Sequence, residues 1–286
     1  MTESSSESSL RYERDGDVAI LSLHVPTRLN PLTHDIQRGL REHLARMCDE
    51  GRVRALVLTG TGKAFCVGAD LSSMGAAGVG AAGVGAAGTG AAGADDGPSL
   101  GQRTADGMAA LSNRLIADIR ALPFPVVSAV NGPTAGAGVG LALSADVVVA
   151  ARSAYFYLPF MPRLGIVPDL GTTWFLERCI GRARSVALSL LGDRLSAEQA
   201  AQWGLIWACV DDAVLRQEAL AIAQRLARLP AHAAREIRQA YESAGRVSLP
   251  EQLHYEAERQ RELIDRPEFS EGVKAFREKR EPVFGR

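Results

Sequence analysis

The chain has 286 residues, of which 47% are hydrophobic, so it is long and apolar enough to bury a substantial core. Its formal net charge of -1 gives no reason to expect nucleic acid or an anionic membrane as a partner. The four cysteines are far apart and form no Cys-x-x-Cys pair, so neither a zinc knuckle nor a disulfide framework is indicated. Reduced thiols in a cytoplasmic protein are the simpler interpretation.

Neither the N-terminus nor the most apolar window suggests export or membrane insertion. Met1–Ser9 is polar and acidic and lacks the basic and apolar regions of a signal peptide. We expect residues 1–12 to form a disordered tail. The window Val126–Ala151 contains Asn131, Asp146 and several glycines, so we do not expect a membrane-spanning helix.

The first half of the chain alternates between patterns typical of strands and of helices. Val18–Val25 and Val53–Thr59 are expected to be strands. Between them lies a predicted helix with an apolar face at three- and four-residue spacing, formed by Ile36, Leu40, Leu44 and Met47. Arg103–Leu122 repeats the helical period, and Pro123 ends it.

The second half begins with buried strands and becomes mostly helical. Val126–Val130 and Val147–Ala151 are expected to be strands on either side of a short Gly-rich helix. Ser196-Ala-Glu-Gln199 has the form of a capping box, and Gly204 ends that helix. This alternation predicts an α/β core over residues 13–210 and a helical C-terminal region over residues 211–286.

A repetitive segment interrupts the core. Gly75–Ala94 consists of four Gly- and Ala-rich pentads with almost no side chain to bury, so a mobile loop is the default expectation for the insertion at residues 74–99. The alternative is a lid over a neighbouring site, because the segment directly follows a Gly-rich loop and long loops are often functional.

Two Gly-rich loops carry the strongest functional signal. They span residues 60–71 and 131–140, and each follows an apolar β-branched run. Small residues at such turns leave backbone N–H groups open to a polarised oxygen. Two loops that each supply one N–H form a candidate oxyanion hole, which indicates carbonyl chemistry. The alternative is that both loops are merely tight turns.

Neither loop fits a nucleotide-binding motif. A phosphate-binding loop would need glycine where Val57 stands and Ser or Thr where Ala64 follows the lysine. A dinucleotide fingerprint at Gly136–Gly140 would need an acidic residue about twenty positions later, and none is there.

The motifs resemble those of the crotonase superfamily, the enoyl-CoA hydratases and isomerases. The first is Gly-x-Gly-Lys-Ala-Phe-Cys-x-Gly-Ala-Asp-Leu, and the second is Pro-Val-x-x-x-Val-Asn-Gly-x-x-x-Gly-x-Gly. The likeness runs from about Val18 to the end, apart from residues 74–99, with further matches at Leu164–Gly171, Gly192–Ala200 and Trp203–Ile206. The resemblance implies a crotonase-type spiral of ββα turns with a helical C-terminal trimerisation region.

The resemblance also implies an assembly. We expect a homotrimer or a dimer of trimers, with Glu251–Ile264 and Glu271–Lys279 at a subunit interface. Phe276 or Lys279 would reach the coenzyme A site of a neighbouring subunit.

The substrate implied by the resemblance is an acyl-CoA thioester. Its carbonyl oxygen would be held by the backbone N–H groups of Ala69 and Ala137. Residues at positions that match the strip cradling adenine are Ala64, Ala69, Asp70 and Leu71. Arg28 matches a position near the phosphates of coenzyme A, although a solvated surface charge is nearly as good an interpretation. Coenzyme A would enter as part of the substrate, so we expect no separate cofactor and no metal.

The acid–base groups point away from simple hydration. Hydratases of the superfamily use two glutamates, which would fall at Gly140 and Met161, and neither of these residues can move a proton. Asp169 remains. Ring-1,2-epoxyphenylacetyl-CoA isomerases and related Δ3,Δ2-enoyl-CoA isomerases carry their catalytic acid at the matching place. We therefore predict an enoyl-CoA isomerase with Asp169 as its proton shuttle. Apolar neighbours in sequence, such as Val167 and Leu170, favour a raised pKa for this carboxyl.

Three alternatives remain open. Asp169 could cap the helix that begins near Gly171. The protein could be an enoyl-CoA hydratase of fatty-acid β-oxidation whose carboxylates come from elsewhere, or a non-catalytic acyl-CoA-binding relative. The five histidines show no triad or metal-binding spacing that would suggest another chemistry.

Overall fold

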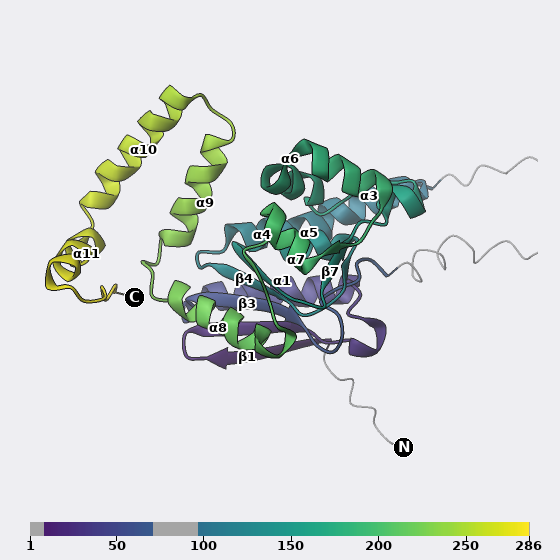
Figure 1. Cartoon of the computed structure of the whole chain (residues 1–286), viewed down its shortest axis with the longest axis horizontal. Helices are drawn as coiled ribbons and strands as arrows, with labels where there is room; N and C mark the ends of the chain where they lie inside the picture. The colour runs from purple at the N-terminus through teal and green to yellow at the C-terminus, as the bar shows by residue number, and fades with distance from the viewer. Residues whose placement is uncertain (1–8, 71–96, 286) are drawn as a thin grey trace, which may run out of the picture.

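The computed structural model describes residues 9–70 and 97–285. Leu71 and the pentads of Gly75–Ala94 lie outside these ranges. Within them a six-stranded sheet has the order β1-β2-β3-β4-β6-β9 (Figure 1). Its strands are β1 (Leu10–Asp15), β2 (Val18–Leu23), β3 (Ala55–Gly60), β4 (Val126–Val130), β6 (Val147–Ala151) and β9 (Ala208–Val210). Only the β1–β2 pair of this sheet is antiparallel.

A second, three-stranded sheet has the order β5-β7-β8. Its strands are β5 (Thr134–Ala135), β7 (Tyr155–Tyr157) and β8 (Leu195–Ser196). Since β5 belongs to the second Gly-rich loop, this small sheet fixes the backbone of that loop just before α5 (Ala137–Leu143) begins.

The predicted strands are confirmed, to within two residues at their ends. β2 and β4 are buried along their whole length, as expected of strands covered on both faces. The predicted disordered tail over residues 1–12 is too long, because residues 10–12 form part of β1. The side chain of Leu10 is buried against Gly39 of α1, and this packing gives the strand its place at the sheet edge.

The first predicted helix is α1 (His34–Glu50). The Thr33 side chain accepts a hydrogen bond from the Ile36 N–H at its start, and Gly51 ends it in a left-handed conformation. All four residues of its predicted apolar face are buried.

The second predicted helix is divided into three pieces. These are α3 (Leu100–Gly107), η2 (Met108–Ser112), which is a π-helical turn, and α4 (Asn113–Ala121). A π turn holds one extra residue, so the apolar stripe shifts where it occurs. Leu115 and Ile119 are buried as predicted, whereas Met108 and Leu111 are only partly covered.

The remaining helices of the main body follow β6. They are the π turn η3 (Phe160–Leu164), α6 (Thr172–Leu191), α7 (Ala197–Trp203), the short 3-10 turn η4 (Asp212–Val214) and α8 (Leu215–Leu226). A second short 3-10 turn, η1 (Pro26–Arg28), lies earlier, between β2 and α1. The predicted cap of α7 is confirmed, since Ser196 accepts from the Gln199 N–H at 3.2 Å and Gly204 is left-handed. Although α8 lies beyond residue 210, it packs on β2, β3, β4 and β6, so the core extends further than predicted.

Three C-terminal helices extend away from the sheet. They are α9 (Ala233–Ala244), α10 (Leu249–Ile264) and α11 (Pro267–Glu278), and Figure 1 shows them as an arm beside the main body. Arg238 anchors α9, because its buried guanidinium pairs with Asp146 at 2.5 Å and donates to the carbonyls of Leu122 and Phe124. In residues 9–70 and 97–285, no helix is both long and apolar enough to cross a bilayer.

Candidate active site

The two Gly-rich loops lie against each other, held by side-chain amides and backbone hydrogen bonds. The Asn131 side chain accepts from the Gly60 N–H at 3.1 Å and donates to the Gly62 carbonyl at 3.0 Å. Further along, the Ala135 N–H donates to the Cys66 carbonyl at 2.9 Å. This bridge continues the strand alignment of β3 and β4 into the loops, so their tips are placed together.

The loops approach so closely that glycine is required at two contact points. A Cβ atom added at Gly68, where φ is +88°, would lie 2.8 Å from the Ala135 carbonyl oxygen and 3.1 Å from the Ala137 nitrogen. A Cβ added at Gly138 would lie 2.3 Å from the Cys66 carbonyl oxygen. The absence of side chains therefore brings the residues after Gly68 next to the start of α5.

The structure brings Ala69 and Ala137 into this junction. Ala69 directly follows Gly68 and is exposed. Ala137 is the first residue of α5, where helix geometry leaves the N–H without an intrahelical partner. In the part of the chain that the structure describes, neither N–H donates a hydrogen bond to a protein acceptor. Neither donor is therefore committed to a protein acceptor within the described residues.

Two predicted coenzyme A contacts form an ion pair with each other. The Arg28 guanidinium lies 2.5 Å from the Asp70 carboxylate, and the Arg28 side chain remains 52% exposed. Ala64 lies beneath this surface with no exposed area, and its carbonyl accepts from Asn30 Nδ2 at 2.8 Å. A ligand that reaches this loop would meet Arg28, Ala69 and Asp70 before Ala64. Leu71 lies outside the described residues.

Asp169 occupies a tight turn immediately before α6. The Thr172 N–H donates to the Asp169 carbonyl at 2.9 Å, and both central residues have positive φ, +48° at Leu170 and +75° at Gly171. Leucine rarely adopts this conformation, which costs roughly 1–2 kcal/mol relative to a right-handed one. Backbone held in such a state is a frequent mark of functional sites.

The Asp169 carboxyl is largely buried and poorly satisfied. Its Oδ1 atom is buried and has no hydrogen-bond partner within residues 9–70 and 97–285, and burial raises the pKa of the carboxyl from 3.8 to about 6. The capping alternative is not observed, because Gly171 is the N-cap of α6 and no side chain of the described residues caps that helix end. Asp169 thus combines burial with an unused acceptor, as a proton-transfer group near neutral pH requires.

The turn that holds Asp169 packs directly on α5. A Cβ added at Gly140 would lie 2.4 Å from the Leu170 carbonyl oxygen and 3.0 Å from Thr172 Oγ1. Gly140 and Ala137 are three residues apart and so share one face of α5. The turn that carries Asp169 therefore packs on the same helix that begins with Ala137. Met161, at the other glutamate position, lies on η3 and is partly exposed.

Exposed apolar side chains lie in the chain segment that precedes this acid. Met161, Leu164, Ile166 and Val167 are exposed, Val167 to 70%. They lie in the segment that leads from η3 to Asp169. This surface suits an acyl chain, because covering it would remove apolar area from water. The sequence motif pointed to Asp169, but it did not predict the left-handed conformation of Leu170 or the burial of the Thr172 hydroxyl. Gly171, which permits the tight turn, was the local sequence feature that could have indicated it.

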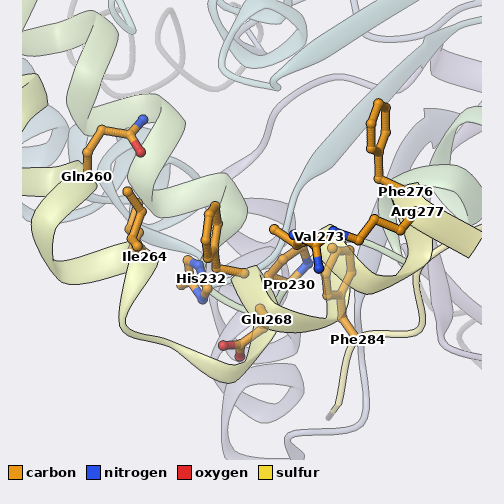
Figure 2. Close-up of a pocket in the computed structure, with 12 residues that line it drawn as sticks. Pro230, His232, Gln260, Ile264, Glu268, Val273, Phe276, Arg277 and Phe284 are labelled. Carbon is orange, nitrogen blue, oxygen red and sulfur yellow. The ribbon is translucent and has the colours of Figure 1, made fainter.

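The larger of two described surface grooves lies elsewhere. It has a volume of about 530 Å³ and is formed by the C-terminal helices, with Ile264, Val273 and Phe276 among its lining residues (Figure 2). None of the predicted catalytic residues lines it. Its apolar lining belongs to the arm of α9, α10 and α11 rather than to the two Gly-rich loops.

The chain matches known proteins over nearly its whole length. The family model described as enoyl-CoA hydratase/isomerase matches residues 13–89 and 84–286. The 1,2-epoxyphenylacetyl-CoA isomerase of Escherichia coli (strain K12) is 40% identical over 267 residues, covering 93% of this chain and 94% of that protein. A probable enoyl-CoA hydratase of Rhodobacter capsulatus is 38% identical over 276 residues, covering 96% and 97%.

Solved structures show the same fold. A crystal structure of an enoyl-CoA hydratase from Polaromonas sp. JS666 superimposes with a TM-score of 0.83 and 29% sequence identity, covering 97% of this chain and all of that one (100%). An enoyl-CoA hydratase structure from Bacillus anthracis gives a TM-score of 0.81 at 29% identity, covering 97% of this chain and 99% of that one. The predicted crotonase fold is therefore confirmed, and the chain belongs to the enoyl-CoA hydratase/isomerase family.

Proposed function

We propose that this family member is an enoyl-CoA isomerase that moves a double bond within an acyl-CoA thioester, with Asp169 as its proton shuttle. The observation that supports this most is the packing of the Asp169 turn on α5 at Gly140, three residues after Ala137 at the start of that helix. Positions 140 and 161, where a hydratase of this superfamily would hold carboxylates, are Gly and Met.

The proposed reaction begins with the thioester oxygen between the N–H groups of Ala69 and Ala137. The Asp169 carboxylate takes a proton from C2 of a 3-enoyl thioester, and the electrons of that C–H bond enter a dienolate whose negative oxygen the two N–H groups stabilise. Asp169 then returns the proton to C4, and the double bond moves from C3=C4 to C2=C3. Atoms and charge balance, so one carboxylate suffices.

The environment of Asp169 fits this cycle. With a pKa of about 6, the carboxyl is mostly ionised at neutral pH, yet it is a stronger base than an exposed aspartate. Hydration would require a second group to orient water, and neither Gly140 nor Met161 can supply one. A pair of dedicated donors and one buried carboxylate instead match an enolate-forming isomerisation.

The coenzyme A portion is proposed to lie over the first loop. Arg28 and Asp70 present a half-exposed ion pair beside Ala69, and the guanidinium keeps donors available for a phosphate oxygen. Leu71 would continue the strip beyond the described residues. We also propose that the enzyme assembles as a homotrimer or dimer of trimers through the C-terminal arm, where Phe276 is 86% exposed.

The test is Asp169→Asn, which keeps the shape and removes the base. Isomerisation of a 3-enoyl-CoA is expected to fall by about 100-fold or more, the lower end of general-base effects. Binding of the same ester, measured by calorimetry, is expected to persist. Full activity of the variant would contradict the assignment of Asp169. Failure of the folded wild type to bind coenzyme A esters would contradict the substrate class.

A further inference from the structure

The side-chain hydroxyl of Thr172 is buried and takes no part in the proposed reaction as described above. The residue has no exposed area, and its Oγ1 atom has no hydrogen-bond partner among the described residues. A hydroxyl buried without a partner costs free energy that a valine of the same shape would avoid. The neighbouring Thr173 is exposed and carries no such cost.

Two unsatisfied buried oxygens lie in one four-residue turn. Asp169 is the first residue of the turn and Thr172 the last, joined by the 2.9 Å hydrogen bond from the Thr172 N–H to the Asp169 carbonyl. In such a turn the first and last Cα atoms are less than about 7 Å apart. Asp169 Oδ1 and Thr172 Oγ1 both lack a partner among the described residues, so they are not hydrogen-bonded to each other in this structure, although one is an acceptor and the other can donate.

The Thr172 hydroxyl also faces the empty position on α5. Its Oγ1 lies 3.0 Å from where a Cβ of residue 140 would be, so it occupies the space in which a longer side chain at that position would begin. The hydroxyl is therefore between the helix that carries the Ala137 N–H and the turn that carries the proposed base.

We propose that Thr172 is a positioning residue whose hydroxyl, without a partner among the described residues, turns to donate a hydrogen bond to the Asp169 carboxylate when that group is ionised. This rests on the proposed function of Asp169 as the proton shuttle. The bond stabilises the charged form of the base and holds it in one orientation toward C2. When Asp169 takes the proton, the bond weakens, which leaves the acid free to turn toward C4.

The decisive variant is Thr172→Val, which keeps the branched shape and removes only the hydroxyl. Thr172→Ser keeps the hydroxyl, and Thr173→Val is the matched control one residue away. For the wild type and each variant, kcat/KM for a 3-enoyl-CoA is measured over about four pH units, from roughly pH 4.5 to 8.5. Loss of a hydrogen bond to the charged form should move the acid limb of Thr172→Val to higher pH by about one unit. The limb should be unchanged in Thr172→Ser and Thr173→Val.

A second readout does not depend on activity. The carboxyl carbon of Asp169 is titrated by NMR in protein labelled at aspartate, with its signal assigned by its loss in Asp169→Asn. The pKa of this carboxyl is expected to be about one unit higher in Thr172→Val than in the wild type. Thr172→Ala replaces the valine variant if thermal unfolding shows that valine does not fit.

Equal acid limbs and equal carboxyl pKa values in wild type and Thr172→Val would overturn the inference. That outcome is distinct from failure of the proposed function. Full activity of Asp169→Asn would contradict the shuttle even if the NMR titration showed the Thr172 effect, whereas an inactive Asp169→Asn with an unmoved titration would contradict only the role of Thr172.

Discussion

Gly140 of α5 lies directly against Leu170, close enough that a Cβ at residue 140 would be 2.4 Å from the Leu170 carbonyl oxygen. A hydratase of this superfamily would have a catalytic glutamate at position 140. In this chain, the space for the Cβ of such a side chain is filled by the backbone of the turn that carries Asp169. The carboxylate that we propose as the base, Asp169, comes from the turn before α6 rather than from α5.

Gly140→Ala is therefore expected to destabilise the fold by about 1–3 kcal/mol or more, as overpacking of a tight core does. Gly140→Glu is expected to be worse and to produce no hydratase activity. Chemical denaturation measures the first effect. Gly107→Ala is the control, because it lies at the end of α3 with open space around its added Cβ, and it should be neutral or slightly stabilising. A Gly140→Glu variant as stable as the wild type would show that the Asp169 turn can move away from α5, which would contradict this prediction.

Asp169→Asn is expected to stabilise the protein at pH 8. The folded-state pKa of about 6 is above the ordinary 3.8, so the folded protein retains a proton that the unfolded chain loses between those values. Wild-type stability therefore falls as the pH rises from about 4 through 6, and the asparagine variant lacks this fall. Each unit of pKa difference corresponds to about 1.4 kcal/mol, so the gain is at most about 3 kcal/mol.

Urea denaturation at several pH values checks this prediction. The two proteins should converge below about pH 4 and separate as the pH rises. A variant that is less stable than the wild type at pH 8 would show instead that Asp169 has a structural role, as a cap would.

Most of the fold could be predicted because it follows from periodicity. The apolar spacing at Ile36, Leu40, Leu44 and Met47 and the β-branched run Val126–Val130 each determine which face is buried, and both are confirmed. The edge strand Leu10–Asp15 was missed because only Leu10 in it is fully buried. The π turn at Met108–Ser112 was missed because residue spacing does not reveal an extra residue in a helical turn.

Part of the candidate site could likewise be predicted from the sequence, and part could not. The glycine motifs locate Ala69 and Ala137, since close backbone contact needs glycine at particular positions. The Arg28–Asp70 pair joins residues 42 apart in sequence, and no local pattern predicts it. The contacts of Gly140 with Leu170 and Thr172 depend on how α6 packs on α5, which only the three-dimensional structure gives.

Ala137→Pro tests the proposed oxyanion donor on α5. Ala137 is the first residue of the helix, where proline is tolerated, so this change removes one N–H without interrupting helical hydrogen bonds. The loss of one donor should lower kcat by about 100- to 1,000-fold, or roughly 2.7–4 kcal/mol. Ala137→Gly retains the N–H and is expected to remain active. Unchanged turnover in a folded Ala137→Pro variant would exclude this N–H as a donor.

Arg28→Ala tests recognition of the coenzyme A phosphates. The variant should bind an acyl-CoA roughly fivefold more weakly, about 1 kcal/mol, since the guanidinium is half exposed. It should bind a short thioester that lacks phosphates as the wild type does. Arg38→Ala removes a comparable exposed ion pair on α1 and serves as the control. Equal weakening for both ligands would mean that Arg28 only holds Asp70 and the first loop in place.

The central claim, that one carboxylate shifts a double bond and does not add water, is tested most directly by product mass. Wild-type enzyme is incubated separately with a 3-enoyl-CoA, a 2-enoyl-CoA and a cyclic enoyl-CoA, and the products are followed by mass spectrometry and by the absorbance of the conjugated thioester. The account predicts conversion of the 3-enoyl ester to the 2-enoyl ester at unchanged mass. Rapid formation from the 2-enoyl ester of a product heavier by one water, without isomerisation of the 3-enoyl ester, would contradict it.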